Sequence, residues 1–125
     1  MVEVDVENRS GRAVDAEAAV ALVRQVLDDE GIDDGELALH FVEPDEIRAL
    51  KREHLGIDEE TDALAFPIDA RDELPLGVPR QLGDVIVCPA VVGAEWRPPL
   101  VHALLHLLGH DHGPEMEARE RIHLQ

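Results

Sequence analysis

The chain has 125 residues, of which 45% are hydrophobic and 31% are charged. This length fits one domain, and this composition excludes wholesale disorder. The 11 lysines and arginines are outnumbered by 28 aspartates and glutamates, so the net charge is −17. A chain this acidic repels polyanions as a whole, so any nucleic-acid binding must depend on a local basic patch or a metal ion.

The single cysteine, Cys88, excludes an internal disulfide and favours a reducing compartment. The N-terminus, MVEVDVEN, lacks the basic and apolar regions of a signal peptide. No apolar stretch approaches the length of a membrane span. We therefore expect a cytoplasmic protein without a membrane partner.

The first half of the chain alternates strand and helix patterns. Valines at positions 2, 4 and 6 alternate with acidic residues, as in a half-buried strand. Apolar residues then recur with helical spacing from Asp15, a candidate N-cap, to Gly31, a helix stop. Alternation returns at 37–41 and predicts a second strand.

Pro44 suits the first turn of a second helix, which Gly56 ends. We expect its inward face to carry Ile47 and Leu50, together with His54 or Leu55.

The second half predicts two strands and then two helices. The apolar run 63–66 stops at a proline and predicts an edge strand, and the proline-rich segment 67–81 predicts a surface loop. The run 85–88 is continuously apolar, as in a strand buried on both faces. Helices are expected over 99–109 and from 114 to about 124. The order β-α-β-α-β-β-α-α predicts one α+β domain over 1–125, with a small mixed sheet of about four strands packed with helices.

Histidines are concentrated near the C-terminus, in the stretch VHALLHLLGHDH. His102 and His106 are four residues apart, so on a helix they stand one turn apart on one face. Gly109 can adopt the left-handed conformation that ends a helix and reverses the chain, bringing His112 toward the same point. Three imidazoles with a fourth position open are typical of a catalytic zinc site.

A metal-free histidine cluster is the alternative interpretation. The residues between His102 and His106 are apolar, so this helix must be buried. An unsatisfied buried polar group costs about 1–3 kcal/mol, and a metal ion supplies the missing partner. Burial and spacing together favour the metal site.

The same histidine spacing occurs in metzincin proteases, where a glutamate general base follows the first histidine. Here that position is Ala103, which argues against a peptide hydrolase. Two neighbouring side chains have open roles. His110 is a fourth ligand, a proton shuttle or an exposed turn residue, and Asp111 either orients a ligating imidazole or belongs to the turn.

Three blocks of the sequence resemble one known family. The stretch HALLHLLGHDH resembles the HGxLHLxGYDH signature of the YbeY family of metal-dependent endoribonucleases. TDALAFP and LGDVIVC resemble the family's TDVLSFP and LGDIVIC, in the same order. The resemblance covers roughly residues 37–125.

The resemblance implies a small mixed sheet with a metal helix beside it, and zinc held by His102, His106 and His112. It also implies hydrolytic cleavage of single-stranded RNA, in 3′-end maturation of the 16S RNA of the small ribosomal subunit and in ribosome quality control. The implied partners are this RNA and the small subunit, and DNA is not expected. A zinc ion lowers the pKa of its bound water to about 7, which makes this metal-bound water a candidate catalytic group. The nucleophile is either this water, as hydroxide, or the 2′-hydroxyl of the RNA.

Some positions depart from the family pattern. The family commonly has an arginine near its RNA channel where this chain has Leu55. Only Pro89 to Val101 separate Cys88 from the histidine helix, a shorter connection than is usual in the family. These departures concern substrate binding and leave the three histidines intact.

Two aspartates in the family blocks, Asp84 and Asp62, are candidates for supporting the metal site. The alternative interpretation is structural: Asp84 belongs to a turn at the end of a strand, and Asp62 caps a helix or a strand. Cys88 is expected to be a buried apolar residue and not a ligand.

Candidate substrate-binding residues are Arg48, Arg52 and Arg80, which with Lys51 and Arg97 would form a positive groove beside the metal. The alternative is that these side chains are surface charges paired with neighbouring acids.

Two other functions remain open. One is a zinc-dependent hydrolase of another class, such as a peptidase. The other is a ribosome-associated factor that keeps the fold and the metal but is catalytically silent.

Overall fold

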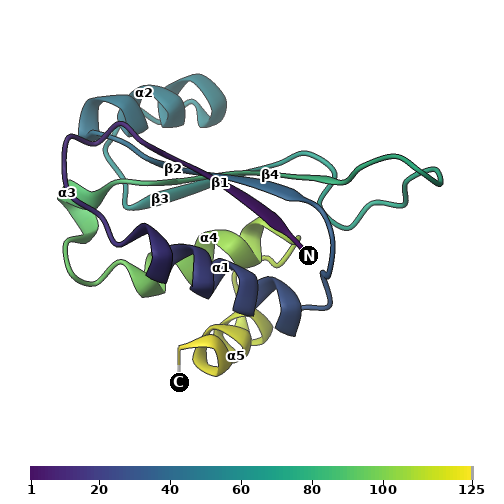
Figure 1. Ribbon diagram of the computed structural model, residues 1–125. Helices are drawn as coiled ribbons and strands as arrows, with labels where there is room; N and C mark the ends of the chain where they lie inside the picture. The colour runs from purple at the N-terminus through teal and green to yellow at the C-terminus, as the bar shows by residue number, and fades with distance from the viewer. Residues whose placement is uncertain (125) are drawn as a thin grey trace.

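The computed structural model describes residues 1–124, which form a four-stranded sheet with helices on both faces (Figure 1). The strands and helices, in chain order, are β1 (Glu3–Asn8), α1 (Ala16–Asp29), β2 (Glu36–Phe41), α2 (Pro44–Leu55), β3 (Ala63–Pro67), β4 (Gln81–Val87), α3 (Pro89–Val92), α4 (Arg97–Leu107) and α5 (Pro114–His123).

The strand order in the sheet is β1-β2-β4-β3. β1, β2 and β4 run parallel, and β3 pairs with β4 in the antiparallel sense. The predicted α+β fold with a small mixed sheet is confirmed. β3 lies at an edge, as the proline at its end predicts, because a proline has no N–H to donate to a further strand.

The helices cover the sheet unequally. α1, α4 and α5 lie on one side of the sheet in Figure 1, and α2 lies on the other. The larger core forms on the first side, where Leu39 of β2 packs with Val23 of α1 and Leu104 of α4. The smaller core lies under α2, where Ile47 packs with Cys88. Cys88 is fully buried, as predicted.

Most element boundaries agree with the sequence prediction. Asp15 caps α1, because its side chain accepts a hydrogen bond from the N–H of Ala18. The one-turn helix α3 is not predicted, since four residues are too few for a periodic signal.

The predicted inward placement of His54 or Leu55 is wrong. Both side chains are exposed at the C-terminal end of α2. His54 lies against the ring of Phe66, with 4.7 Å between the ring centroids. The reason is that the smaller core contacts α2 through Ile47 and Leu50, one or two turns earlier.

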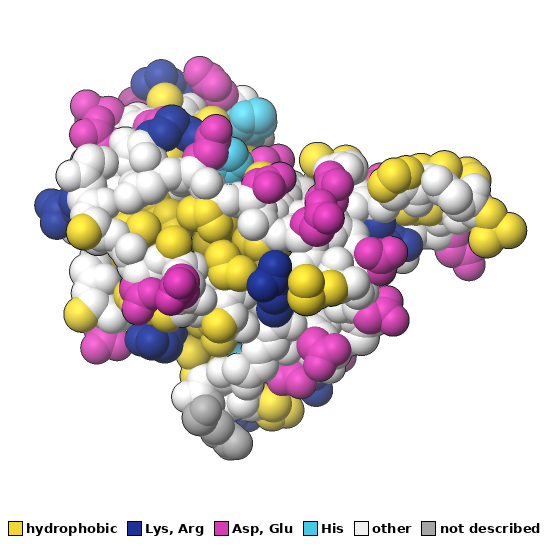
Figure 2. All heavy atoms as spheres, in the orientation of Figure 1, with side chains coloured by type: hydrophobic (Ala, Val, Ile, Leu, Met, Phe, Trp, Pro, Cys, Tyr) yellow, Lys and Arg dark blue, Asp and Glu magenta, His cyan; other side chains and the backbone are white. Residues whose placement is uncertain are grey.

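The predicted surface loop between β3 and β4 projects from the body as an arm (Figures 1 and 2). Hydrophobic side chains gather on this arm, and Leu76 is fully exposed. Acidic side chains are spread over the rest of the same face in Figure 2. Among residues 1–124, no helix has the length and apolar character to cross a membrane.

Gly83 of β4 allows the sheet and α4 to approach closely. Its φ is +142°, and a Cβ added there would lie 2.3 Å from the carbonyl oxygen of Phe66 and 2.8 Å from a methyl group of Leu107. A residue with a side chain would therefore push apart β3, β4 and the end of α4. The glycine of the LGDV block thus fixes the position of the helix that carries His102 and His106.

Candidate metal centre

Three imidazoles converge beside the end of α4. Each of His102, His106 and His112 offers one ring nitrogen, and these atoms lie within 4.8 Å of one another. The Nε2 atoms of His102 and His106 are 3.1 Å apart. Two nitrogens bound tetrahedrally to one zinc at about 2.1 Å are separated by roughly 3.4 Å, so this pair fits a shared ion.

The local sequence explains how the third histidine reaches the other two. His102 and His106 stand one turn apart on α4. Gly109 follows the helix with a φ of +96°, and the N–H of His110 donates back to the carbonyl of Leu105 at 3.0 Å. This arrangement reverses the chain as predicted, and it carries His112 to the ring pair.

Burial differs among the three histidines. The apolar side chains of α4, such as Leu104 and Leu105, are fully buried in the larger core. His102 and His106 are half-buried beside them, whereas His112 is exposed. The cluster is therefore anchored in the core on one side and open to solvent on the other, as a site for an external substrate requires.

A carboxylate fixes the ring of His102. Its Nδ1 atom lies 2.7 Å from Oε1 of Glu120 on α5. A ring N–H that donates to a carboxylate leaves Nε2 free to bind a metal and fixes the orientation of the ring. Glu120 could not be predicted from the sequence, because the position of α5 against α4 has no local signal.

Burial lowers the pKa of His106, and the positive charges of His102 and His112 lower it further. A backbone hydrogen bond involving His110 and the charge of Asp111 act in the opposite direction. The net effect favours the neutral imidazole, which is the form that binds a metal.

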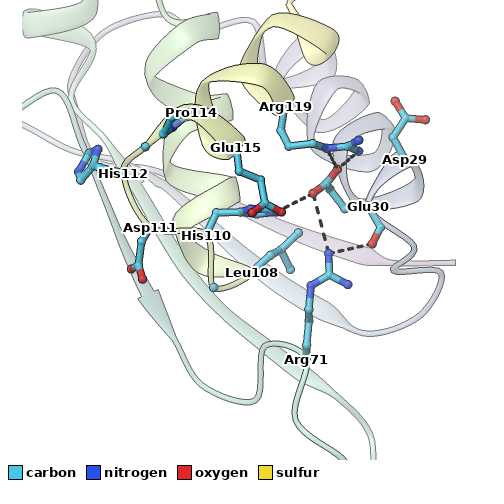
Figure 3. Close-up of a pocket in the computed structure, with 12 residues that line it drawn as sticks. Asp29, Glu30, Arg71, Leu108, His110, Asp111, His112, Pro114, Glu115 and Arg119 are labelled. Atoms are coloured by element: carbon cyan, nitrogen blue, oxygen red, sulfur yellow. Dashed lines mark hydrogen bonds and ion pairs between the residues drawn. The ribbon is translucent and has the colours of Figure 1, made fainter.

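The two residues before His112 point in different directions (Figure 3). His110 turns toward Glu30, with 2.9 Å between its Nε2 atom and Oε1 of the carboxylate. Asp111 is exposed and points away from Glu30. Both residues line an open pocket of about 790 Å³ together with His112.

The sequence comparisons identify the family. The family model described as Endoribonuclease YbeY matches residues 5–125. The chain belongs to the YbeY family.

Similar curated proteins have the same family name. An Endoribonuclease YbeY of Halorhodospira halophila is 38% identical over 125 aligned residues, which cover 87% of this chain and 80% of the relative. One of Salinispora tropica is 33% identical, over 99% of this chain and 92% of the relative. Membership of this family supports an RNA-cleaving hydrolase.

A solution structure from Thermotoga maritima has a similar fold. The TM-score is 0.62 at 23% sequence identity, and the match covers 99% of this chain and 87% of that chain. At this identity the likeness shows the fold alone.

The structure does not place the two aspartates of the YbeY-like blocks beside the histidines. Asp84 lies on the α2 side of the sheet, where its Oδ1 atom is 3.0 Å from Nε2 of His40. It shares that side of β4 with Ile86, because side chains alternate along a strand. Asp62 is exposed and accepts a hydrogen bond from the N–H of Ala63 at 2.7 Å, as a strand cap does.

The three candidate substrate-binding arginines contact a carboxylate or backbone carbonyls away from the histidines. Arg48 donates to Asp58 at 2.7 Å, and Arg52 lies 3.6 Å from the same carboxylate. Both belong to α2, across the sheet from α4. Arg80 donates to backbone carbonyls of the projecting arm, at Ala70 and Asp72.

The structure therefore does not bring these arginines together into a groove beside the histidines. Leu55, at the position where the YbeY family commonly has an arginine, has 54% of its surface exposed.

Proposed function

We propose that this chain is a zinc-dependent endoribonuclease that cleaves single-stranded RNA in the cytoplasm. Its proposed role is 3′-end maturation of 16S RNA and ribosome quality control, with the small ribosomal subunit as partner. The convergence of three imidazole nitrogens within 4.8 Å carries the metal-dependent part of the proposal. Family membership supports the action on RNA. The ribosomal role derives from the family resemblance alone.

The residues present fit a zinc ion. Three imidazole nitrogen donors and an open side are the ligand set of catalytic zinc, and the set includes none of the oxygen donors that calcium and magnesium prefer. When bound, zinc supplies a Lewis acid for a phosphate oxygen and a more acidic water.

The chain's own residues prepare the site. Glu120 holds His102 so that Nε2 faces His106, and burial lowers the pKa of His106, which favours its neutral form. His112 leaves the site open to solvent on its exposed side. Asp111 immediately precedes His112 in the sequence, and its carboxylate is exposed. It is therefore our candidate for holding a proton at this opening.

The residue after the first histidine favours phosphodiester hydrolysis over peptide hydrolysis. A metzincin-type protease needs a glutamate beside the first histidine ligand. That residue is Ala103, which is buried and has no group that accepts a proton. We therefore do not retain the peptidase hypothesis.

A catalytically silent ribosome factor is the second candidate. Two observations favour it: Leu55 replaces the usual arginine, and Arg48 and Arg52 lie near Asp58 on the α2 side of the sheet.

The pairing with Asp58 does not prevent these arginines from binding RNA. Exposed ion pairs of this kind contribute only about 0–1 kcal/mol, so RNA phosphates can displace Asp58. The arginines of α2 thus remain proposed substrate contacts, as does Arg80.

Incubation of the zinc-loaded protein with three substrates tests the proposal. The substrates are single-stranded 16S RNA 3′-end precursor, the same sequence in a duplex, and casein. Cleavage of the single strand alone supports the endoribonuclease. A folded, metal-loaded protein that cleaves none of them supports the silent factor, and turnover of casein would restore the peptidase.

A further inference from the structure

Glu30 is a buried carboxylate immediately after α1, and its side chain has only 3% of its surface exposed. An isolated buried charge is costly, so a carboxylate at such a position requires cationic or N–H partners. Figure 3 shows Glu30 at the centre of a group of side chains that come from separate parts of the chain.

Three other segments supply these partners. His110, in the turn after α4, lies 2.9 Å from Oε1. From α5, Arg119 donates through Nε to Oε2 at 2.8 Å and pairs with the same oxygen through Nη2, and His123 lies 3.1 Å from it. Arg71, from the arm, donates to the backbone carbonyl of Glu30 at 2.9 Å.

Two of these segments carry parts of the metal centre. His110 is two residues before His112, the third candidate ligand, in the turn that joins α4 to α5. Arg119 immediately precedes Glu120, which orients the ring of His102. Glu30 thus contacts both the ligand turn and the helix that supports another ligand, although it contacts none of the three histidines.

We infer that Glu30 is a positioning residue of the metal centre, which fixes the turn of His112 and the helix of Glu120 relative to α4. The inference rests on the metal-binding part of the proposed function. Its physical basis is charge: one buried carboxylate fixes two segments that have little apolar surface of their own. Removal of the charge frees both segments and lowers metal affinity before it unfolds the larger core.

Cobalt binding tests this inference independently of RNA cleavage. Co²⁺ bound at a tetrahedral nitrogen site gives a visible spectrum, so a titration reports both affinity and geometry. Loss of a hydrogen-bonding group outside the ligand shell typically lowers metal affinity by about 10- to 100-fold. We expect Glu30→Gln to lower Co²⁺ affinity by about tenfold, at the lower end of this range. Asp28→Asn is the matched control, because Asp28 is an exposed carboxylate at the same end of α1, two residues before Glu30.

A second pair of variants removes the same contact without altering Glu30. His110→Gln keeps an N–H donor near the position of Nε2, whereas His110→Met has a similar length and no donor. We expect the methionine variant to lose affinity about tenfold and the glutamine variant to stay close to the wild type. If Glu30→Gln does not fold, these two His110 variants test whether Glu30 positions the metal centre.

The outcomes separate this inference from the proposed function. Weakened cobalt binding in Glu30→Gln and His110→Met, with normal binding in Asp28→Asn and His110→Gln, supports the positioning role. Wild-type cobalt affinity and spectrum in folded Glu30→Gln, or in His110→Met, overturns it. A wild-type protein that binds no cobalt overturns the metal site itself, and this inference with it.

Discussion

The Nδ1 atom of His102 on α4 lies 2.7 Å from the carboxylate of Glu120 on α5, so the C-terminal helix orients a side chain of the candidate metal site. Glu120→Gln weakens the acceptor and lets the ring of His102 rotate. We expect zinc affinity to fall by about tenfold in a competition titration with a chromogenic chelator. Glu117→Gln, an exposed change on the same helix, should leave affinity unchanged. Equal affinities of the two variants would contradict this role of Glu120.

Metal removal should destabilise the folded protein, because the three histidines meet only in the folded chain. At a free zinc concentration of one hundred times Kd, binding contributes about 2.7 kcal/mol, which corresponds to roughly 10 °C in Tm. Calorimetry with and without a chelator measures this difference. His106→Ala should abolish the zinc-dependent shift, whereas His54→Ala, an exposed histidine on α2, should retain it. A Tm that is unchanged after verified metal removal would argue against the site.

Gly83 should tolerate no side chain, because a Cβ there would lie 2.3 Å from the carbonyl oxygen of Phe66. We expect Gly83→Ala to lower the free energy of unfolding by about 3 kcal/mol in urea denaturation. Gly77→Ala is the matched control: its φ of +83° is also unfavourable, but a Cβ meets nothing within 4 Å. Its expected cost is about 1–2 kcal/mol. Equal costs at the two sites would show that close approach at Gly83 does not matter.

The candidate ligands could be predicted from sequence because their geometry is local. Helical spacing places His102 beside His106, and a glycine reverses the chain so that His112 follows within six residues. Strand and helix order could be predicted for the same reason, since hydrophobic periodicity reports each element separately. The one-turn helix α3 was too short for such a signal.

The supporting groups could not be predicted, because they depend on how distant elements pack. Glu120 is 18 residues from His102, and Glu30 is 80 residues from His110. Asp84 lies on the α2 side of the sheet because of its register in β4, which the LGDV motif alone does not specify. The pairing of Arg48 with Asp58 likewise depends on the course of the chain after α2.

Acid should weaken the protein partly through Glu30. Burial raises the pKa of this carboxyl, but hydrogen bonds from Arg119, His110 and His123 and the charge of Arg119 outweigh burial, so the pKa is lower than the ordinary value of 4.5. Arg71 and Asp29 are the other charged neighbours. A lowered pKa contributes stability that is present above about pH 4.5 and is lost as the pH falls through the folded-state value.

The measurement is urea denaturation of metal-free wild type and Glu30→Gln at several pH values. We expect the wild type to be more stable at pH 7, and the difference to shrink as the pH falls below about 4.5. A difference that is constant from pH 7 to pH 3 would show that the Glu30 charge does not contribute to stability.

Metal-dependent RNA cleavage provides the most direct test of the proposed function. Untagged protein is incubated with single-stranded RNA, with and without a chelator, beside the His106→Ala variant. We expect zinc-loaded wild type to cleave the RNA, and cleavage to be lost in the chelated sample and in the folded variant. Cleavage that persists at the wild-type rate in His106→Ala or after verified zinc removal would contradict a catalytic role for the three histidines.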